Sequence, residues 1–322
     1  MNIGIIGYGN IGQIRHQKAL EIFPDAKFMA YDPYIVDSPR VEIFPSAEAV
    51  ITKSDCVFIC TPNYLNAKHT IQSLRLGKHV FCEKPPALNY DELLEVEDEY
   101  SRHPDLNLIY GFNHRQYDSI QMMKALIDSN DTGKVLWMRG RYGKAIGNPN
   151  NSGWRSDPAK SGGGILLDQG IHMLDLMIYF GGPFDEVNAI VTNNLWNVEG
   201  IEDNAFVILQ NNKDKVSASL HSTMIEWRYV FSLEVLMESG YLALNGLKTP
   251  SGSYGKEVLT ICDDKRRSAG RSESTIIEFK NNNTWEKEVS GFFDGVMGTP
   301  KTNLPDALEV MKTIKEAYRG KR

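Results

Sequence analysis

The chain has 322 residues, of which 42% are hydrophobic and 24% charged, and this length allows two domains that each bury a core. Its formal net charge of -6 offers no basic surface for nucleic acid or for an anionic membrane, so we exclude both as expected partners. No apolar stretch reaches the roughly 20 residues of a membrane helix, and the first strand begins at residue 2 without a signal-peptide pattern, so we expect a cytoplasmic protein.

The first third of the chain alternates short apolar runs with helical patterns, as in a parallel sheet with helices on both faces. We predict strands at residues 2–6, 27–31, 41–44, 55–60, 79–82 and 107–112. We predict helices at residues 11–21 and 65–76, a short helix capped by Ser46, and a helix from an Asn89–Glu92 capping box to about Tyr100. These elements predict an α/β Rossmann domain, a doubly wound parallel sheet, over residues 1–115.

The pattern changes after Gly111-Phe112-Asn113. We predict helices at residues 118–128, 164–180 and 305–318, with a strand at 135–142. Further strands are predicted at residues 185–192, 203–210, 215–224, 229–237, 240–244, 257–262 and 274–279. The pattern indicates an α+β domain over residues 116–322 with an open-faced, mainly antiparallel sheet.

A glycine motif, Gly7-Tyr8-Gly9-Asn10-Ile11-Gly12, follows the first predicted strand and opens the first helix. In this context the glycines allow a tight turn and bring backbone N–H groups close to a dinucleotide pyrophosphate. Asp32 ends the second strand, where a carboxylate accepts from the adenosine ribose hydroxyls and repels a 2′-phosphate. The predicted cofactor is therefore NAD, with NADP disfavoured, and the residues predicted to bind it are Gly7, Gly9, Asn10, Ile11, Gly12 and Asp32.

Two polar clusters follow strands at the carboxyl edge of the predicted sheet, where ligands bind in α/β folds. Thr61-Pro62-Asn63 follows one strand, and Glu83-Lys84 follows another. Taken alone, the first pattern is better explained by a simple proline turn, and the second fits a structural surface ion pair equally well. The clusters are therefore candidate site residues only in combination with the glycine motif.

Asp168, His172 and Asp175 have the i, i+4, i+7 spacing of one helix face, beside an apolar stripe. This spacing fits the wall of a cleft, and it also fits a salt-linked histidine on an ordinary helix. Asp and His are metal-ligand types, but a lysine such as Lys84 in the same cleft disfavours a bound cation. We therefore predict no metal site.

These motifs, in this order, resemble the Gfo/Idh/MocA oxidoreductases, the glucose-fructose oxidoreductase and inositol dehydrogenase group. The resemblance covers residues 1 to about 182; beyond them only the β-rich pattern agrees. The motifs that carry it are the glycine motif, Thr61-Pro62-Asn63, the segment from Gly77 to Pro85, Gly111-Phe112-Asn113, and Gly163-Gly164 with Asp168-x-Gly170-Ile171-His172. The family implies an NAD(P)-binding domain followed by an open-faced sheet that commonly forms dimers or tetramers.

The resemblance also implies the roles of individual residues. Lys84, Asp168 and His172 match the family's catalytic positions, and Thr61, Pro62, Asn63, Glu83 and Lys84 match its cofactor-binding positions. In the implied mechanism His172 takes a proton from a sugar hydroxyl, which suits an imidazole with an ordinary pKa of about 6.5. Lys84 donates to the reacting oxygen, Asp168 holds the alcohol or tunes the histidine, and the Lys84-Pro85 bond is often cis in relatives.

Trp154-Arg155 resembles a pair found in sugar-acting relatives, where an indole stacks on a pyranose and a guanidinium binds a carboxylate or phosphate. We therefore predict Trp154, Arg155, Asp168 and His172 as substrate-binding residues; an ordinary loop pair is an equal alternative for the first two. Where many relatives read Asn-x-Arg-Phe-x-Pro, this chain reads Asn113-His114-Arg115-Gln116-Tyr117-Asp118. That departure removes the support for a substrate role of Arg115.

We therefore expect an NAD-dependent oxidoreductase that transfers a hydride between nicotinamide and a secondary alcohol or ketone of a sugar, cyclitol or nucleotide sugar. A homodimer or homotetramer is expected. Two alternatives stay open: a glycoside hydrolase that uses bound NAD, and a non-catalytic sensor of NAD or sugar. A sensor needs no proton-transfer group, so the set of Lys84, Asp168 and His172 argues against the second.

Overall fold

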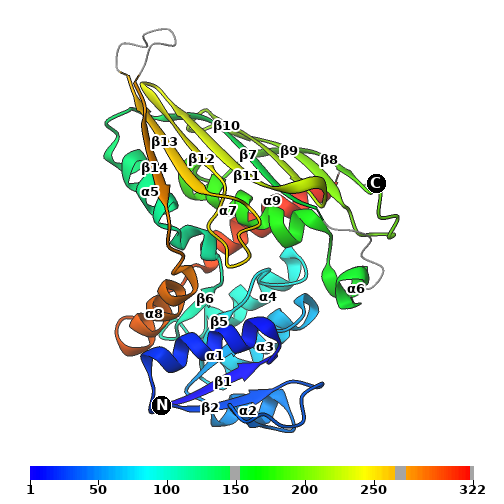
Figure 1. Ribbon diagram of the computed structural model, residues 1–322. Coiled ribbons are helices and arrows are strands. Elements are labelled where there is room, and N and C mark those ends of the chain that lie inside the picture. The colour runs from blue at the N-terminus through cyan, green and yellow to red at the C-terminus, as the bar shows by residue number, and fades with distance from the viewer. Residues whose placement is uncertain (146–152, 265–272, 320–322) are drawn as a thin grey trace. The chain divides into compact units, whose positions relative to one another are not determined.

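The computed structural model describes residues 1–145, 153–264 and 273–319 (Figure 1). The contacts between residues divide the chain into two units. The first contains Met1–Asn113, Ala159–Gly162 and Thr284–Met311, and the second contains His114–Pro158, Gly163–Asn283 and Lys312–Arg322. The predicted boundary at residue 115 assigns Ala159–Gly162 and Thr284–Met311 to the second domain, whereas the contacts place both segments in the first unit.

The first unit contains a parallel sheet with the strand order β3-β2-β1-β4-β5-β6. This order confirms the predicted doubly wound fold, and the winding reverses between β1 and β4, where α/β folds bind ligands. The strands are β1 (Asn2–Ile6), β2 (Lys27–Tyr31), β3 (Glu42–Ile43), β4 (Cys56–Ile59), β5 (His79–Cys82) and β6 (Leu108–Tyr110). The helices are α1 (Asn10–Ile22), α2 (Ala47–Lys53), α3 (Asn63–Arg75), α4 (Tyr90–Tyr100) and α8 (Thr284–Met297).

Local hydrogen bonds explain where two of these helices begin. The Ser46 hydroxyl accepts from the Ala49 N–H at 3.1 Å, and the Asn89 side chain accepts from the Glu92 N–H at 3.0 Å. Both caps confirm the predicted helix starts. The Glu92 carboxylate accepts in turn from the N–H of Leu88 at 3.0 Å, one residue before the cap.

Helix α8, which the sequence analysis did not predict, packs its aromatic residues into the core of the first unit. Phe292 meets Phe58 and Phe81 edge-on, with ring centroids 5.2 and 5.8 Å apart. The Asn107 side chain donates to the Phe292 carbonyl at 3.0 Å and accepts from the Lys301 N–H at 2.8 Å. These contacts attach the C-terminal segment to the sheet of the first unit.

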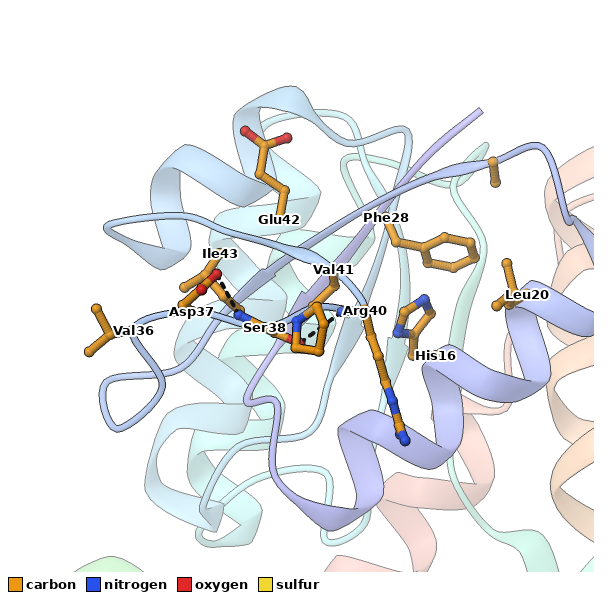
Figure 2. Close-up of a pocket in the computed structure, with 12 residues that line it drawn as sticks. His16, Leu20, Phe28, Val36, Asp37, Ser38, Arg40, Val41, Glu42 and Ile43 are labelled. Atoms are coloured by element: carbon orange, nitrogen blue, oxygen red, sulfur yellow. Dashed lines mark hydrogen bonds between the residues drawn. The ribbon is translucent and has the colours of Figure 1, made fainter.

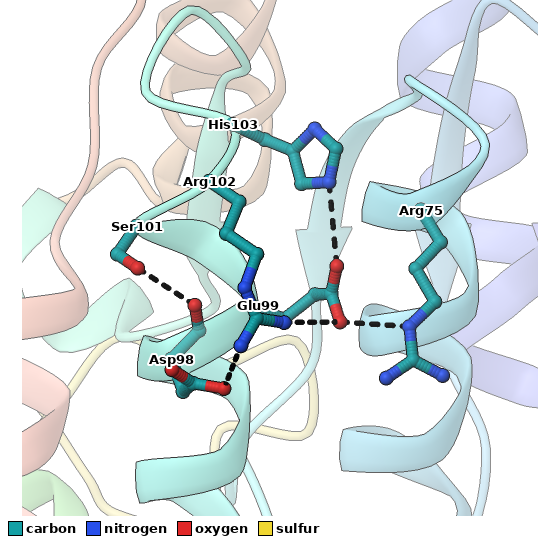
Figure 3. Close-up of polar contacts among 6 residues, drawn as sticks. All are labelled: Arg75, Asp98, Glu99, Ser101, Arg102 and His103. Carbon is teal, nitrogen blue, oxygen red and sulfur yellow. Dashed lines mark hydrogen bonds and ion pairs between the residues drawn. The ribbon is translucent and has the colours of Figure 1, made fainter.

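Helices α3 and α4 are joined by the carboxylate of Glu99, which is 4% exposed (Figure 3). It accepts from the Arg75 Nε of α3 at 2.7 Å and from Arg102 at 3.4 Å, and it shares a hydrogen bond with His103 at 3.3 Å. The cluster therefore has a structural role, since a buried carboxylate requires such partners.

The second unit contains a larger sheet in the order β14-β13-β12-β11-β7-β10-β9-β8. Strands β7 and β10 pair in parallel and the other neighbours pair antiparallel, which confirms the predicted mainly antiparallel sheet. The strands are β7 (Val135–Ala145), β8 (Glu186–Thr192), β9 (Asn204–Asn211), β10 (Val216–Thr223), β11 (Ile225–Met237), β12 (Gly240–Asn245), β13 (Glu257–Asp263) and β14 (Thr275–Phe279). The helices are α5 (Asp118–Ser129), α6 (Pro158–Ser161), α7 (Ile171–Gly181) and α9 (Leu304–Arg319), of which α6 and α9 cross from one unit into the other.

Helices cover one face of this sheet. Along β7, side chains on the covered face are buried and those on the other face are exposed. Met138 and Tyr142 are buried, whereas Trp137, Arg139 and Arg141 point to the other face and are exposed. Helix α7 packs against β7 and β10, and α5 packs against β13 (Figure 1). Within the described part of the chain, no helix has both the length and the hydropathy to cross a bilayer.

Candidate functional site

The glycine motif forms a tight turn between β1 and α1 in the first unit. Gly7 has φ +86°, and a Cβ added to Gly12 would overlap the carbonyl oxygen of Gly7. A Cβ added to Gly9 would meet no atom within 4 Å. Gly7 and Gly12 are therefore required by the turn itself, whereas Gly9 leaves open space at the start of α1. Helix α1 has no side-chain cap and no acid in its first turn, so its N-terminal N–H groups suit an anion such as a pyrophosphate.

Asp32 follows β2 and is directed toward this turn. Its Oδ2 accepts from the Tyr8 N–H and its Oδ1 accepts from the Tyr34 N–H, each at 2.9 Å. Each carboxylate oxygen can accept more than one hydrogen bond, so ribose hydroxyls can still donate to Asp32. The residues of the turn therefore fit a bound dinucleotide.

A pocket of about 600 Å³ lies beside α1 and the loop between β2 and β3 (Figure 2). His16 and Arg40 are among its lining residues, and Figure 2 shows the Arg40 side chain extending past the His16 ring. The Tyr8 hydroxyl and His16 Nδ1 share a 2.6 Å hydrogen bond. Burial, and then the positive charge of Arg40, lower the pKa of His16. The sequence analysis did not identify this pocket.

Thr61 and Asn63, after β4, make contacts within the first unit. The Thr61 hydroxyl donates to the side chain of Asn66 at 2.8 Å, and the Asn63 amide donates to the carbonyl of Ser161 at 2.8 Å. The Asn66 amide donates in turn to the Pro85 carbonyl at 2.8 Å, next to the Lys84-Pro85 peptide, which is cis. Asn66 therefore links the ends of β4 and β5, a role that the sequence analysis missed.

The partly buried Glu83 forms an ion pair with the buried Arg15 of α1. Arg15 is 1% exposed, and its Nε donates to Glu83 at 2.7 Å while its Nη2 donates to Glu288 of α8 at 2.7 Å. The guanidinium also lies 4.4 Å from the centre of the Phe81 ring. The Arg15 guanidinium thus links α1 to the end of β5 and to α8. Glu83 and Lys84 are both partly buried.

The predicted regular helix at residues 164–180 differs from the structure. Residues Leu166–Gly170 form a π-helical turn, and the α-helix α7 begins at Ile171. Asp168 is partly exposed, whereas His172 and Asp175 are buried, and the π turn interrupts the regular i, i+4, i+7 spacing from which a common face was predicted. Asp175 accepts from Arg115, whose Nη2 lies 2.6 Å from Oδ1. The π turn changes the spacing on which the prediction rested, and such turns are frequent at functional sites.

The start of this helical segment is held by Glu202, which is fully buried. Its carboxylate accepts from the N–H groups of Gly164 and Leu166 at 2.8 and 3.0 Å and from the Tyr318 hydroxyl at 2.7 Å. A Cβ at Gly164 would overlap the Glu202 backbone, and one at Gly163 would overlap the Tyr318 hydroxyl. The glycine run therefore allows close packing around Glu202.

His172 lies in a buried cluster of the second unit. Its ring stacks on that of His114, with centroids 4.0 Å apart and planes 24° apart. The Nε2 of His114 and the Tyr142 hydroxyl share a 3.1 Å hydrogen bond. Burial raises the pKa of Tyr142 well above its ordinary value and raises that of Tyr254, and the charge of Asp168 contributes to both shifts. Asp168 is therefore close enough to act electrostatically on both hydroxyls.

Comparisons with known proteins agree with this architecture. Residues 1–112 match the profile of an oxidoreductase family with an NAD-binding Rossmann fold, and residues 120–243 match the GFO/IDH/MocA C-terminal domain. The chain belongs to the Gfo/Idh/MocA family. The resemblance found in the sequence is thereby confirmed.

Individual relatives are similar over different lengths. Glucose-6-phosphate 3-dehydrogenase of Bacillus subtilis is 29% identical over 207 residues, which are 60% of this chain and 58% of the relative, so the chain spans less than two thirds of its length. Levoglucosan dehydrogenase with NADH and levoglucosan has a TM-score of 0.85 at 18% identity, covering 99% of this chain and 97% of the other. KijD10, a 3-ketoreductase from Actinomadura kijaniata with NADP and TDP-benzene, has a TM-score of 0.81 at 20% identity, with the same coverage. These two structures share the fold.

The remaining candidate residues of this Gfo/Idh/MocA protein are Trp154 and Arg155. They lie in a 3₁₀ turn of the second unit, where the Arg155 guanidinium sits 4.3 Å from the centre of the Trp154 ring. Arg155 is exposed and Trp154 is partly buried. In the part of the chain that the structure describes, no group of three or more His, Cys, Asp or Glu side chains could hold a metal ion.

Proposed function

We propose that this protein is an NAD-dependent oxidoreductase that transfers a hydride between nicotinamide and a secondary alcohol or ketone of a sugar, cyclitol or nucleotide sugar. The observation that carries the proposal is the glycine turn, in which Gly9 leaves the start of α1 open and Asp32 faces the same turn. Membership of the Gfo/Idh/MocA family supports the reaction class. The names of two relatives, glucose-6-phosphate 3-dehydrogenase and myo-inositol 2-dehydrogenase, support a sugar or cyclitol substrate.

Proton transfer is the part of the reaction that we assign to His172. Oxidation of an alcohol releases a proton from the hydroxyl, and a neutral imidazole accepts it near neutral pH. We assign to Asp168 the binding of the substrate hydroxyl, and to Lys84 the donation of a hydrogen bond to the reacting oxygen. When bound, NAD supplies the hydride acceptor at its nicotinamide ring. The protein's own residues then bind the substrate, orient it and move its proton.

Cofactor choice depends on Asp32 and Arg40 in this proposal. The Asp32 carboxylate favours the free ribose hydroxyls of NAD over the 2′-phosphate of NADP, whereas Arg40, in the neighbouring pocket, is a cation that favours a phosphate. Because Asp32 is the residue held against the turn, we expect NAD to be preferred. The kcat/KM ratio for NAD over NADP should fall in Asp32→Ser and rise in Arg40→Ala.

The test is a screen of sugars, inositols and nucleotide sugars with NAD and NADP, followed by absorbance of the reduced cofactor. His172→Ala should lower kcat by roughly 10²- to 10⁴-fold while the Kd for NAD changes little, because the imidazole acts on the proton. Full turnover in His172→Ala would refute its assignment. Net NADH formation from a free sugar also separates a dehydrogenase from a hydrolase that regenerates NAD and from a sensor.

We also propose that the open face of the sheet in the second unit binds a second copy of the chain. Apolar side chains on this face include Ile190, Ile208 and Ile276, which are 66%, 55% and 67% exposed. The charges between them are already paired, as in Arg139–Glu234, so a copy can pack without burying an unpaired charge. Light scattering after gel filtration should show a homodimer or homotetramer for the wild type and a smaller species for Ile208→Lys; a monomeric wild type would refute the proposal.

A further inference from the structure

We infer that His114 is a positioning residue for His172, holding the plane of the imidazole that we propose to accept the substrate proton. The inference rests on the proposed function, because it gives His114 a role only through His172. His114 is absent from the motifs that the sequence analysis singled out as catalytic. Its assignment comes from the packing of the second unit.

The stack of the two rings is the first observation. The centroids lie 4.0 Å apart with the planes 24° apart, and His114 and His172 are 5% and 4% exposed. At this distance the ring faces are in van der Waals contact, so His172 cannot tilt toward His114 without a clash. The stack contacts only the face of the His172 ring. The ring nitrogens form hydrogen bonds in the plane of the ring, which the stack does not occupy. His114 can therefore orient His172 without taking the place of a substrate oxygen.

His114 is itself held on its edge. Its Nε2 shares the 3.1 Å hydrogen bond with the hydroxyl of Tyr142, which is 4% exposed on β7. Burial raises the pKa of Tyr142 well above its ordinary value, so this hydroxyl remains protonated and uncharged. The ring of Tyr117 packs edge-on against His114 at 5.7 Å. These contacts fix the ring against which His172 stacks.

A second link joins the same two segments. Arg115, next to His114, donates from Nε to both carboxylate oxygens of Asp175 at 3.1 and 2.9 Å and from Nη2 to Oδ1 at 2.6 Å. Asp175 lies three residues after His172 on α7. The Arg115 guanidinium also packs 4.5 Å from the centre of the Tyr179 ring, one turn further along. The 3₁₀ turn Asn113–Gln116 therefore contacts successive turns of α7. The Arg115–Asp175 ion pair fixes the position of His114 along α7, beside His172.

The first experiment compares His114→Ala with His114→Phe. Alanine removes the stacked surface, so we expect kcat to fall by roughly 10- to 100-fold, with KM for the sugar and Kd for NAD within about twofold of the wild type. Phenylalanine keeps a flat ring, so it should recover most of the lost kcat. His221→Ala is the matched control: it removes a histidine of the same unit whose ring also stacks at 4.0 Å, on Phe206, and should leave kcat unchanged.

The second experiment places His114→Ala in the His172→Ala background. If His114 acts through His172, the double variant should have the same residual kcat as His172→Ala alone. A further loss in the double variant, or a His114→Ala kcat equal to that of the wild type while His172→Ala is inactive, would overturn the inference and leave the proposed function intact. Full activity of His172→Ala would overturn both. If His114→Ala does not fold, Tyr142→Phe, which removes the hydroxyl that holds His114, carries the test: a lowered kcat with wild-type KM supports positioning, and a wild-type kcat refutes it.

Discussion

The two units build their candidate sites in different ways. In the first, the site comes from one short segment: Gly7, Gly9 and Gly12 shape the backbone, and Asp32 adds a carboxylate. In the second, His172 stacks on His114 of a 3₁₀ turn, and His114 shares a hydrogen bond with Tyr142 of β7. A site made of backbone is vulnerable to an added Cβ, whereas a site made of side chains is vulnerable to loss of a neighbour.

Buried carboxylates differ in the same way. Glu288, in the first unit, pairs with the guanidinium of Arg15. Glu257, in the second, accepts from the Lys248 N–H at 2.9 Å, and burial followed by the nearby Asp118 raises its pKa. The first arrangement stabilises a negative charge by an opposite charge, and the second favours the protonated acid. Three predictions sharpen these comparisons.

The largest expected effect is that of Arg15→Met. The substitution leaves the buried Glu288 carboxylate without its cation, so we expect the free energy of unfolding to fall by about 3–5 kcal/mol. Urea unfolding measures the change. In Arg15→Met/Glu288→Gln part of the loss should be recovered, because the neutral amide replaces the buried charge. A loss below about 1 kcal/mol in Arg15→Met would show that the pair is solvated.

The next effect compares two glycines of one motif. Gly12→Ala forces a Cβ into the Gly7 carbonyl, so we expect a loss of about 2–4 kcal/mol of stability. Gly9→Ala meets no neighbour and should change stability by less than about 1 kcal/mol, but its methyl group fills the space at the start of α1 and should raise the Kd for NAD at least tenfold. Thermal unfolding and calorimetric titration separate the two. Wild-type NAD affinity in Gly9→Ala would show that the pyrophosphate does not approach this residue.

Local signals in the sequence were sufficient for most of the first unit. The glycine turn and the Ser46 and Asn89 caps depend on residues a few positions apart, and the structure confirms these helix starts. Helix α8 was missed although Val289, Phe292, Phe293 and Val296 follow a helical period. Its glycines obscure that pattern: Gly295, for one, is required where α8 approaches the Asn107 side chain.

Contacts between residues that are far apart in the sequence could not be predicted from local patterns. Nothing near Glu202 indicates that its carboxylate accepts from the Gly164 N–H, 38 residues earlier, or that Tyr318 donates to it. The π turn at Leu166–Gly170 has no counterpart in a pattern of period 3.6, so the sequence did not predict it. The His114–His172 stack depends likewise on how the 3₁₀ turn packs against α7. The assignment of Lys84, Asp168 and His172 to catalysis stays a prediction.

The smallest expected effect is that of Glu257→Gln, and it depends on pH. Because the pKa of Glu257 is raised in the folded chain, the folded state binds this proton more tightly than the unfolded state, and the stability it contributes is lost as pH rises above the ordinary value of about 4.3. The amide can still accept from Lys248 and carries no charge. Relative to the wild type, Glu257→Gln should therefore be unchanged near pH 4 and more stable near pH 7, by on the order of 1 kcal/mol. Urea unfolding at both pH values measures this, with Glu199→Gln, an exposed site of the same unit, as the matched control. A variant that is less stable near pH 7 would show that the carboxylate is ionised and stabilising, and that the two units hold buried acids in the same way.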